Sequence, residues 1–512
     1  MSLRKILSSL FIIILLSLQL NGQKVSKLHK KLYEDYDYFI EIMESNPQLD
    51  VRRIVQGVNI LDSVKNNRYR VEQCKNYKDF AFLINKMANL AVDGHFYAGA
   101  IGDSFDDKAV KANNRYGKYF RKHRYSFFVL PYCEIIDGEF LFIQPFGLGN
   151  RNSADTIIPA GAILKSVNGI SPVEYTSQFV SRDHRWDWNL NKFVSNVVRL
   201  KSSQINKIVV DYQGVEKEIL VKPGKHPLLG TKFWVNSDNQ TVKHKSGLFK
   251  SGIYYGGRGI LPYQKGNVWY LTEQKILYIG IPEMFDDENY YVNEILKYKD
   301  VRDIEKIVID IRDNDGGSDL VWVNILRHII DQPLKTELKN TLVNSSLIRQ
   351  ELKDICDFDK VDTITQHQFL PDNKYVCYTE EEIIEPSNSS LNYSGKIFVL
   401  NNNSIYSASG CLIAMAEYHS RIVSIGQPTG FLLGRGCTPV IFQLPNSKLG
   451  IIMHPMIDLT NVSTPEDVFH DKVEIPVKLS AEEWLEFYNG DDEFNTDYLL
   501  NKDLWFKEVL EY

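Results

Sequence analysis

The stretch "IVIDIRDNDGGSD", residues 307–319, decides the fold of this chain. It begins with apolar, β-branched residues, which are typical of a buried strand. The strand runs directly into a charged loop that ends in Gly316 and Gly317. Glycine takes positive φ and lets the backbone approach another group closely. The stretch therefore indicates a core strand followed by a loop whose N–H groups bind an anion or an oxyanion, with a simple turn as the alternative.

The acidic letters of this loop also suggest a calcium site, and the spacing tests that interpretation. If Gly316 takes the place of the invariant EF-hand glycine, the first and last ligand positions fall on Ile311 and Trp322. Neither side chain binds a cation, so the sequence excludes an EF-hand loop here.

The overall composition is that of a globular protein with several domains. A chain of 512 residues is too long for one hydrophobic core, so two to three domains are expected. The formal net charge of −6 gives no indication of a nucleic-acid partner.

The N-terminus has the pattern of a secretory signal peptide, predicted over residues 1–22. Arg4 and Lys5 precede an apolar run that ends at Leu20, and this run is short for a membrane span of about 20 residues. We expect cleavage near Gly22, no stable membrane span afterwards, and a secreted or periplasmic protein of a bacterial cell envelope. An uncleaved anchor is the alternative.

Six cysteines are present, without metal-binding spacing: Cys74, Cys133, Cys356, Cys377, Cys411 and Cys437. Export would permit disulfides. The pairs Cys356–Cys377 and Cys411–Cys437 are conceivable, and the sequence alone does not decide between the possible connectivities.

The pattern of apolar residues divides the mature chain into three domains and a tail. Residues 24–115 have helical periodicity and predict an N-terminal helical bundle, whereas 125–225 contain short strands and turns and predict a β module. Residues 243–490 alternate strands with helices, which indicates a layered α/β domain with a largely parallel sheet. Within it, 335–395 read as a polar, irregular insertion. Residues 491–512 are expected to be a C-terminal tail.

A second informative stretch is "VLNNNSIYSASGCLIAMAEYH", residues 399–419. Ser407 lies between an apolar strand and an apolar helix, where a nucleophile gains from the helix N-terminus. A plain N-cap is the alternative role, and Ser404 and Ser409 compete for either role.

Together these stretches resemble the core of the S41 peptidases. The matching residues are Asp310, Arg312, Asn314, Gly316 and Gly317, then Ser407-Ala408-Ser409, then Ile425-Gly426 and Thr429-Gly430. The resemblance implies a helical bundle, a PDZ-like module over the β region and a ClpP/crotonase-like layered α/β catalytic domain.

The resemblance also implies a serine nucleophile, Ser407, whose base differs between branches of the family. Processing proteases use a lysine 25 residues after the serine, a position that Leu432 occupies here, and no lysine occurs between Lys396 and Lys448. The tricorn-like branch uses a histidine in a Leu-x-Asp-x-His motif. The segment "LAVDGHFYA" supplies His95 at the matching place. The unperturbed pKa of a histidine side chain, about 6.5, suits a general base.

The remaining site residues follow from the same resemblance. The third catalytic residue would be Glu466 or Asp467, although the pattern here departs from that of the family. The oxyanion hole would be formed by the N–H groups of Gly316 or Gly317 and of Ala408. The charges of the loop have a structural role, and we expect a salt bridge from Arg312 to Asp310 or Asp313.

We therefore expect an exported serine endopeptidase or C-terminal processing peptidase. Its partner would be a protein or peptide, held by strand addition to the PDZ-like module, with a free C-terminus as a candidate anchor. No metal or organic cofactor is implied, and the oligomeric state is left open. The alternatives are a catalytically degenerate binder of peptides or ligands and an α/β-hydrolase esterase, which the absence of a Gly-x-Ser-x-Gly elbow disfavours.

Overall fold

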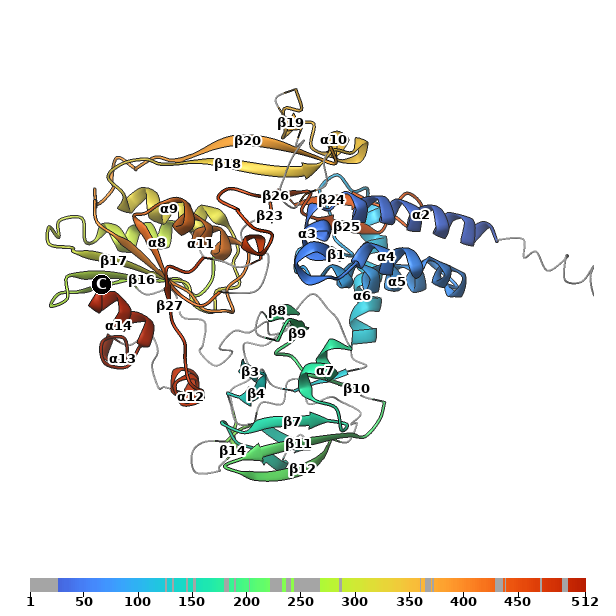
Figure 1. Ribbon diagram of the computed structural model, residues 1–512, viewed down its shortest axis with the longest axis horizontal. Helices are drawn as coiled ribbons and strands as arrows, with labels where there is room; N and C mark the ends of the chain where they lie inside the picture. The colour runs from blue at the N-terminus through green and yellow to red at the C-terminus, as the bar shows by residue number, and fades with distance from the viewer. Residues whose placement is uncertain are drawn as a thin grey trace, which may run out of the picture.

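The computed structural model contains several mixed α/β domains, as the sequence predicts (Figure 1). It describes residues 26–124, 127–130, 133–143, 146–150, 153–178, 184–187, 190–201, 203–221, 233–235, 241–243, 268–284, 288–359, 361–363, 370, 373–428, 436–437, 439–469, 472–489 and 496–512. The predicted leader, residues 1–22, lies outside the described residues.

Helices fill the N-terminal region. They are α2 (Lys27–Glu44), α3 (Pro47–Gln56), α4 (Ile60–Asn66), α5 (Tyr77–Ala88) and α6 (Asp107–Arg124). The side chain of Asn46 accepts a hydrogen bond from the N–H of Gln48, and Pro47 occupies the first helical position, so the sequence fixes the start of α3. The last helix extends beyond residue 115, where the bundle was expected to end.

A small antiparallel sheet follows, at the bottom of Figure 1. Its strands, in spatial order, are β12 (Val215–Val221), β11 (Asn206–Tyr212), β7 (Ile163–Val167), β4 (Glu139–Phe142) and β3 (Cys133–Ile136). Helix α7 (Pro172–Ser177) packs against β7. The likeness of this module to a PDZ domain stays a prediction.

The α/β domain is built on a six-stranded sheet. Its order is β15 (Val268–Leu271), β16 (Ile276–Gly280), β17 (Lys306–Asp310), β21 (Ile397–Leu400), β22 (Ile422–Gly426) and β27 (Ile475–Pro476), and only β15 runs antiparallel to its neighbour. The middle strands are almost completely buried, because helices cover both faces of a parallel sheet.

Each face of this sheet has its own apolar core. On one face, Ile307 and Ile309 pack against α8 (Glu288–Leu296), α9 (Asp319–Ile329) and α11 (Ala408–Tyr418). On the other face, Val308 and Phe398 pack against the helices of the C-terminal region.

The C-terminal residues are not a tail, contrary to the expectation for 491–512. The described part forms α13 (Thr496–Asn501) and α14 (Leu504–Glu511), which follow α12 (Ala481–Asn489) and lie against the sheet in red in Figure 1. Trp505, Phe506 and Val509 are buried on one side of α14. Helix α14 packs against the sheet because its apolar side covers a sheet face that would otherwise be exposed to water.

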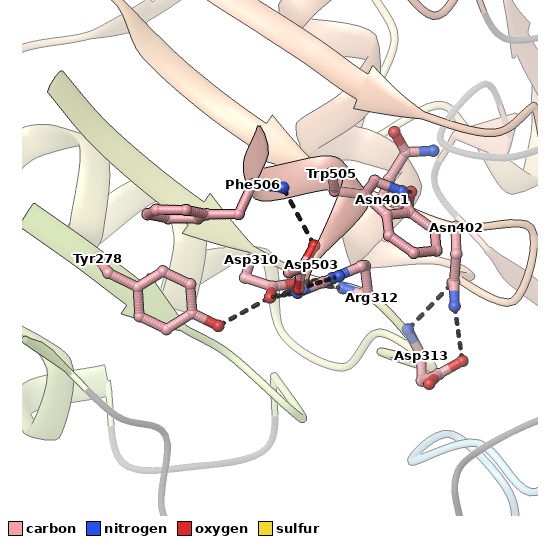
Figure 2. Close-up of polar contacts among 9 residues, drawn as sticks. All are labelled: Tyr278, Asp310, Arg312, Asp313, Asn401, Asn402, Asp503, Trp505 and Phe506. Atoms are coloured by element: carbon pink, nitrogen blue, oxygen red, sulfur yellow. Dashed lines mark hydrogen bonds and ion pairs between the residues drawn. The ribbon is translucent and has the colours of Figure 1, made fainter. Parts of the chain in front are cut away.

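A buried charge network connects this C-terminal region to the loop after β17 (Figure 2). The guanidinium of Arg312 pairs with Asp310, which confirms one of the two partners expected for it. Nη1 of Arg312 also lies 2.7 Å from Oδ2 of Asp503. Asp503 also caps α14. The indole N–H of Trp505 donates to the carbonyl of Asn401 at 2.8 Å, so the same helix touches the ends of both β17 and β21.

A second sheet extends from the α/β domain toward the N-terminal helices. Its order is β19 (Asp362–Thr363), β20 (Tyr375–Ile384), β18 (Leu334–Val343), β26 (Met456–Asp458) and β23 (Gly436–Cys437). The long β18–β20 pair, at the top of Figure 1, occupies the region predicted to be an irregular insertion. Its Leu342 and Val376 share one core with the N-terminal helices, which accounts for its regular structure.

Two smaller expectations concern thiols and membranes. Cys356 is a free thiol, so the conceivable Cys356–Cys377 disulfide is not formed, and the side chain of Cys437 lies outside the described residues. In the described part of the chain, every helix is too short or too polar to cross a bilayer.

The buried network predicts a large loss of stability when its cation is removed. Arg312→Met leaves two carboxylates buried without their counter-charge, which costs about 3–5 kcal/mol. The matched control is Lys502→Met, which removes the exposed pair with Glu486 at 3.0 Å and costs less than about 1 kcal/mol. Thermal melts followed by circular dichroism would measure both. Equal melting temperatures for the two variants would contradict this account of Arg312.

Candidate active site

The site forms where two neighbouring strands end. β17 and β21 are parallel and adjacent, with Asp310 opposite Leu400, so the loops after their carboxyl ends meet. Asp313 and Asn402 tie these loops together reciprocally, because the N–H of Asp313 donates to Oδ1 of Asn402 at 3.1 Å and Nδ2 of Asn402 donates to Oδ1 of Asp313 at 2.8 Å (Figure 2).

Asn314 fixes the relative position of the two loops. It is completely buried, and its Nδ2 donates to the carbonyl of Ile281 at 2.7 Å. Its Oδ1 accepts from the N–H of Gly316 at 2.8 Å and from the hydroxyl of Ser409 at 2.7 Å, while its carbonyl accepts from the N–H of Tyr406 at 3.1 Å. The sequence motif contained Asn314 without indicating this role.

Ser407 adopts an unusual backbone conformation at the start of α11, with φ of 59° and ψ of −123°. Such a conformation costs about 1–3 kcal/mol in a residue other than glycine and is common at functional sites. The Ser407 side chain makes no capping hydrogen bond, so the N-cap alternative does not describe it. Of its competitors, Ser409 is buried against Asn314, and the hydroxyl of Ser404 donates to Asn403.

The paired glycines allow close approach, as the opening stretch suggests. A Cβ on Gly316 would lie 2.4 Å from the carbonyl oxygen of Tyr406 and 2.7 Å from Cβ of Ser407. The N–H of Gly316 is used inside its own loop. Within the described ranges, the N–H groups of Gly317 and Ala408 have no acceptor, so these two of the three expected donors are available.

His95 reaches the serine through strand pairing between distant parts of the chain. Strand β1 (Tyr97–Ala98) pairs antiparallel with β25 (Gly450–Met453), with Tyr97 opposite Ile452. This register places His95 opposite His454, and their ring centroids lie 4.6 Å apart. Nε2 of His95 lies 3.1 Å from Oγ of Ser407, although the two residues are 312 positions apart.

The comparisons with known proteins indicate the family of this domain. Residues 275–457 match the family model of peptidase family S41. The chain therefore carries an S41 peptidase domain. No protein among those with curated descriptions matches the chain. The S41 assignment supports a serine peptidase.

Solved structures are similar to nearly the whole chain. Mature CPAF in complex with lactacystin is 14% identical, with a TM-score of 0.54, covering 93% of this chain and 100% of that one. Another crystal structure of mature CPAF is 14% identical with a TM-score of 0.53, covering 94% and 99%. At this identity the likeness establishes a shared fold.

The expected acids, Glu466 and Asp467, are not brought to His95 in this S41 domain. Glu466 is exposed at the start of a short 3-10 turn, and a carboxylate oxygen of Asp467 accepts the N–H groups of Ser463 and Thr464. The carboxylate of Asp467 therefore stabilises its own turn, because the N–H groups of neighbouring residues are the donors that bind it. Neither residue forms a described contact with the imidazole, so both assignments are corrected.

Asp93 is the acid beside the imidazole. Its Oδ1 accepts a hydrogen bond from the backbone N–H of His95 at 2.9 Å and from the hydroxyl of Tyr406 at 3.2 Å, and that hydroxyl oxygen lies 2.9 Å from Nδ1 of His95. The Leu-x-Asp-x-His pattern contained Asp93, but no sequence signal pointed to Tyr406. The one sequence feature that could have found it is its position directly before Ser407.

Buried charges set the electrostatics of the site. Burial raises the pKa of Asp93, but His95, His454 and Arg52 outweigh it and hold the pKa below its ordinary value. Burial lowers the pKa of Arg52 to about 10 against the opposing effect of Asp93, so both groups are charged at neutral pH. Burial also lowers the pKa of His454, which is therefore neutral.

This arrangement has the parts needed for acyl transfer. It combines a serine hydroxyl on a strained backbone, an imidazole at hydrogen-bonding distance, the N–H of Ala408 at the start of α11 and the N–H of Gly317 in the facing loop. In the described part of the chain there is no group of three histidine, cysteine or acidic side chains placed to hold a metal ion.

The close approach of Gly316 predicts that a methyl group there disrupts the site. Gly316→Ala places Cβ against the Tyr406–Ser407 backbone and forces the two loops apart. Gly214→Ala is the matched control, because Gly214 has a similar φ of 80° and nothing within 4 Å of its Cβ position. We expect the control to lose about 1–3 kcal/mol and to keep its reactivity. If Gly316→Ala keeps full reactivity toward a serine-directed probe, the account of Gly316 is wrong.

Burial of His454 predicts a pH dependence of stability. Because the pKa of His454 is lower in the folded than in the unfolded protein, the unfolded state binds the proton first as pH falls below about 6.5. Stability then falls by at most about 1.4 kcal/mol per pH unit from this group. His454→Asn removes this contribution, so the difference in unfolding free energy between the two proteins should change between pH 7 and pH 5. A difference that stays constant with pH would contradict a lowered pKa of His454 in the folded protein.

Proposed function

We propose that this protein is a serine peptidase in which Ser407 is the nucleophile and His95 the general base. The observation that carries the proposal is the 3.1 Å contact between Nε2 of His95 and Oγ of Ser407. The contact depends on the pairing of β1 with β25. A purely structural role of His95 or Ser407 would not require it.

The reaction follows from the positions of these groups. His95 accepts the hydroxyl proton of Ser407 as Oγ attacks the scissile carbonyl, and later gives the proton to the leaving amine. Water then hydrolyses the acyl-enzyme by the same steps. The N–H groups of Ala408 and Gly317 stabilise the oxyanion, and loss of such a donor costs about 3 kcal/mol in the transition state.

The substrate would be a protein or peptide of the cell envelope or its surroundings, consistent with the predicted leader. The PDZ-like module would bind an extended segment by strand addition, with a free C-terminus as the candidate anchor. A contact between Nη1 of Arg185 and the carbonyl of Asn403, at 3.5 Å, links this module to the nucleophile loop. This contact brings the module beside the nucleophile loop, and both cleavage near a tail held by the module and internal cleavage are candidate activities.

A fluorophosphonate probe tests the proposal. The folded protein should be labelled at Ser407, and Ser407→Ala should abolish labelling. His95→Gln should slow labelling at least about 100-fold, because the general base is lost. Ser404→Ala is the matched control and should react normally. Peptide and ester substrates of the same sequence then distinguish peptidase from esterase.

Folded protein that resists the probe and cleaves neither substrate would contradict the proposal. That result would leave a peptide- or ligand-binding protein on the same scaffold.

A further inference from the structure

The imidazole of His95 does not bind its acid directly. Nδ1 of His95 lies 3.9 Å from Oδ1 of Asp93, which is too long for a hydrogen bond. The hydroxyl of Tyr406 fills the gap, at 2.9 Å from Nδ1 and 3.2 Å from the carboxylate.

The number of available protons fixes the direction of these hydrogen bonds. An ionised carboxylate only accepts, so the Tyr406 hydroxyl donates its single proton to Asp93. Toward His95 the same oxygen then accepts, which requires a proton on Nδ1. A neutral imidazole with a proton on Nδ1 has its lone pair on Nε2, the atom that faces Oγ of Ser407.

We infer that Asp93 and Tyr406 form a two-residue relay that holds His95 in the reactive tautomer, with Tyr406 as a positioning residue that no part of the family pattern indicated. The inference rests on the proposed function and deepens it. The relay takes the place of a carboxylate bound directly to the imidazole, the role expected of Glu466 or Asp467.

Gly94 provides the space for this relay. A Cβ at residue 94 would lie 2.5 Å from the hydroxyl oxygen of Tyr406. The rings of His95 and Tyr406 are also nearly parallel, with centroids 4.7 Å apart and an interplanar angle of 16°. Tyr406 therefore restrains the imidazole by both its hydroxyl and its ring.

Arg52 contributes to keeping the acid of the relay charged, beside the larger effects of His95 and of His454, whose ring centroid lies 4.6 Å from that of His95, on the pKa of Asp93. Its Nη2 donates to the carbonyl of Val92 at 3.0 Å, next to Asp93, and its guanidinium lies 4.7 Å from the centroid of the Phe469 ring. The buried cation and the buried carboxylate stabilise each other without a described ion pair. When His95 takes up the serine proton, the charge of Asp93 stabilises the imidazolium through the hydroxyl.

The experiment measures the rate of fluorophosphonate labelling as a function of pH. Tyr406→Phe removes the hydroxyl and keeps the ring, so we expect labelling to slow at least about tenfold at pH 7. The acid limb of the profile should also shift to lower pH, because the imidazolium loses its link to the carboxylate. Asp93→Asn should slow labelling about 100-fold and shift the acid limb in the same direction.

Matched variants control for the loss of a hydroxyl or a charge. Tyr418→Phe removes the hydroxyl of a tyrosine at the end of α11, and this hydroxyl donates to the buried Asp458. Glu466→Gln removes a carboxylate that does not reach His95. Both should keep the rate and the pH profile of the unaltered protein. Asp93→Asn leaves Arg52 buried without its counter-charge, so Tyr406→Phe decides the test if Asp93→Asn fails to fold.

The tautomer gives a measurement that does not depend on catalysis. Long-range proton–nitrogen correlation spectra of histidine-labelled protein, with His95 assigned through His95→Gln, should show the proton on Nδ1 at neutral pH. In Tyr406→Phe this preference should be lost.

Two results would overturn the inference: a proton on Nε2, or a labelling rate and pH profile unchanged in Tyr406→Phe. By contrast, a proton on Nδ1 in a protein that never labels would support the relay and refute the proposed peptidase.

Discussion

The rest of the structure depends on the burial of one guanidinium. Arg312 lies at the end of β17, 6% exposed, between Asp310 from the strand and Asp503 from the C-terminal region. Burial raises the pKa of Asp310, but Arg312 outweighs it and holds the pKa below its ordinary value. A charge this deeply buried must stay paired, so the C-terminal helices stay on the sheet and the loop after β17 keeps its place.

The position of that loop determines the geometry of the candidate site. Asn314 uses its side chain and backbone to join the glycine loop to the turn that holds Ser407. Because the two loops follow adjacent parallel strands, they start close together, and a few hydrogen bonds are enough to fix their relative position. The strained φ of Ser407 is then maintained by packing that the rest of the domain supplies.

The imidazole comes from a different part of the chain, and its placement has a different origin. The antiparallel pairing of β1 with β25 brings His95 across, and the shared core of the N-terminal helices and the β18–β20 pair fixes that pairing. Tyr406 connects the two halves of the site, because it precedes the nucleophile in sequence and contacts both His95 and Asp93. The base and the nucleophile are thus oriented by a residue that moves with the nucleophile turn.

The sequence by itself determined what depends on neighbours along the chain. Strand 307–310, its glycine loop, a serine at the junction of strand and helix and the alternation of strands and helices are local patterns. A local salt bridge of Arg312 is another, although the sequence left Asp310 and Asp313 open as its partner. Only the tertiary structure decided that Tyr406 lies between His95 and Asp93, that Asp503 completes the ion network and that the C-terminal residues cover the sheet. The contacts of Tyr406 with Asp93 and His95 and of Arg312 with Asp503 join residues from about 190 to over 300 positions apart. They depend on strand register and core packing, which local propensity and motif spacing do not encode.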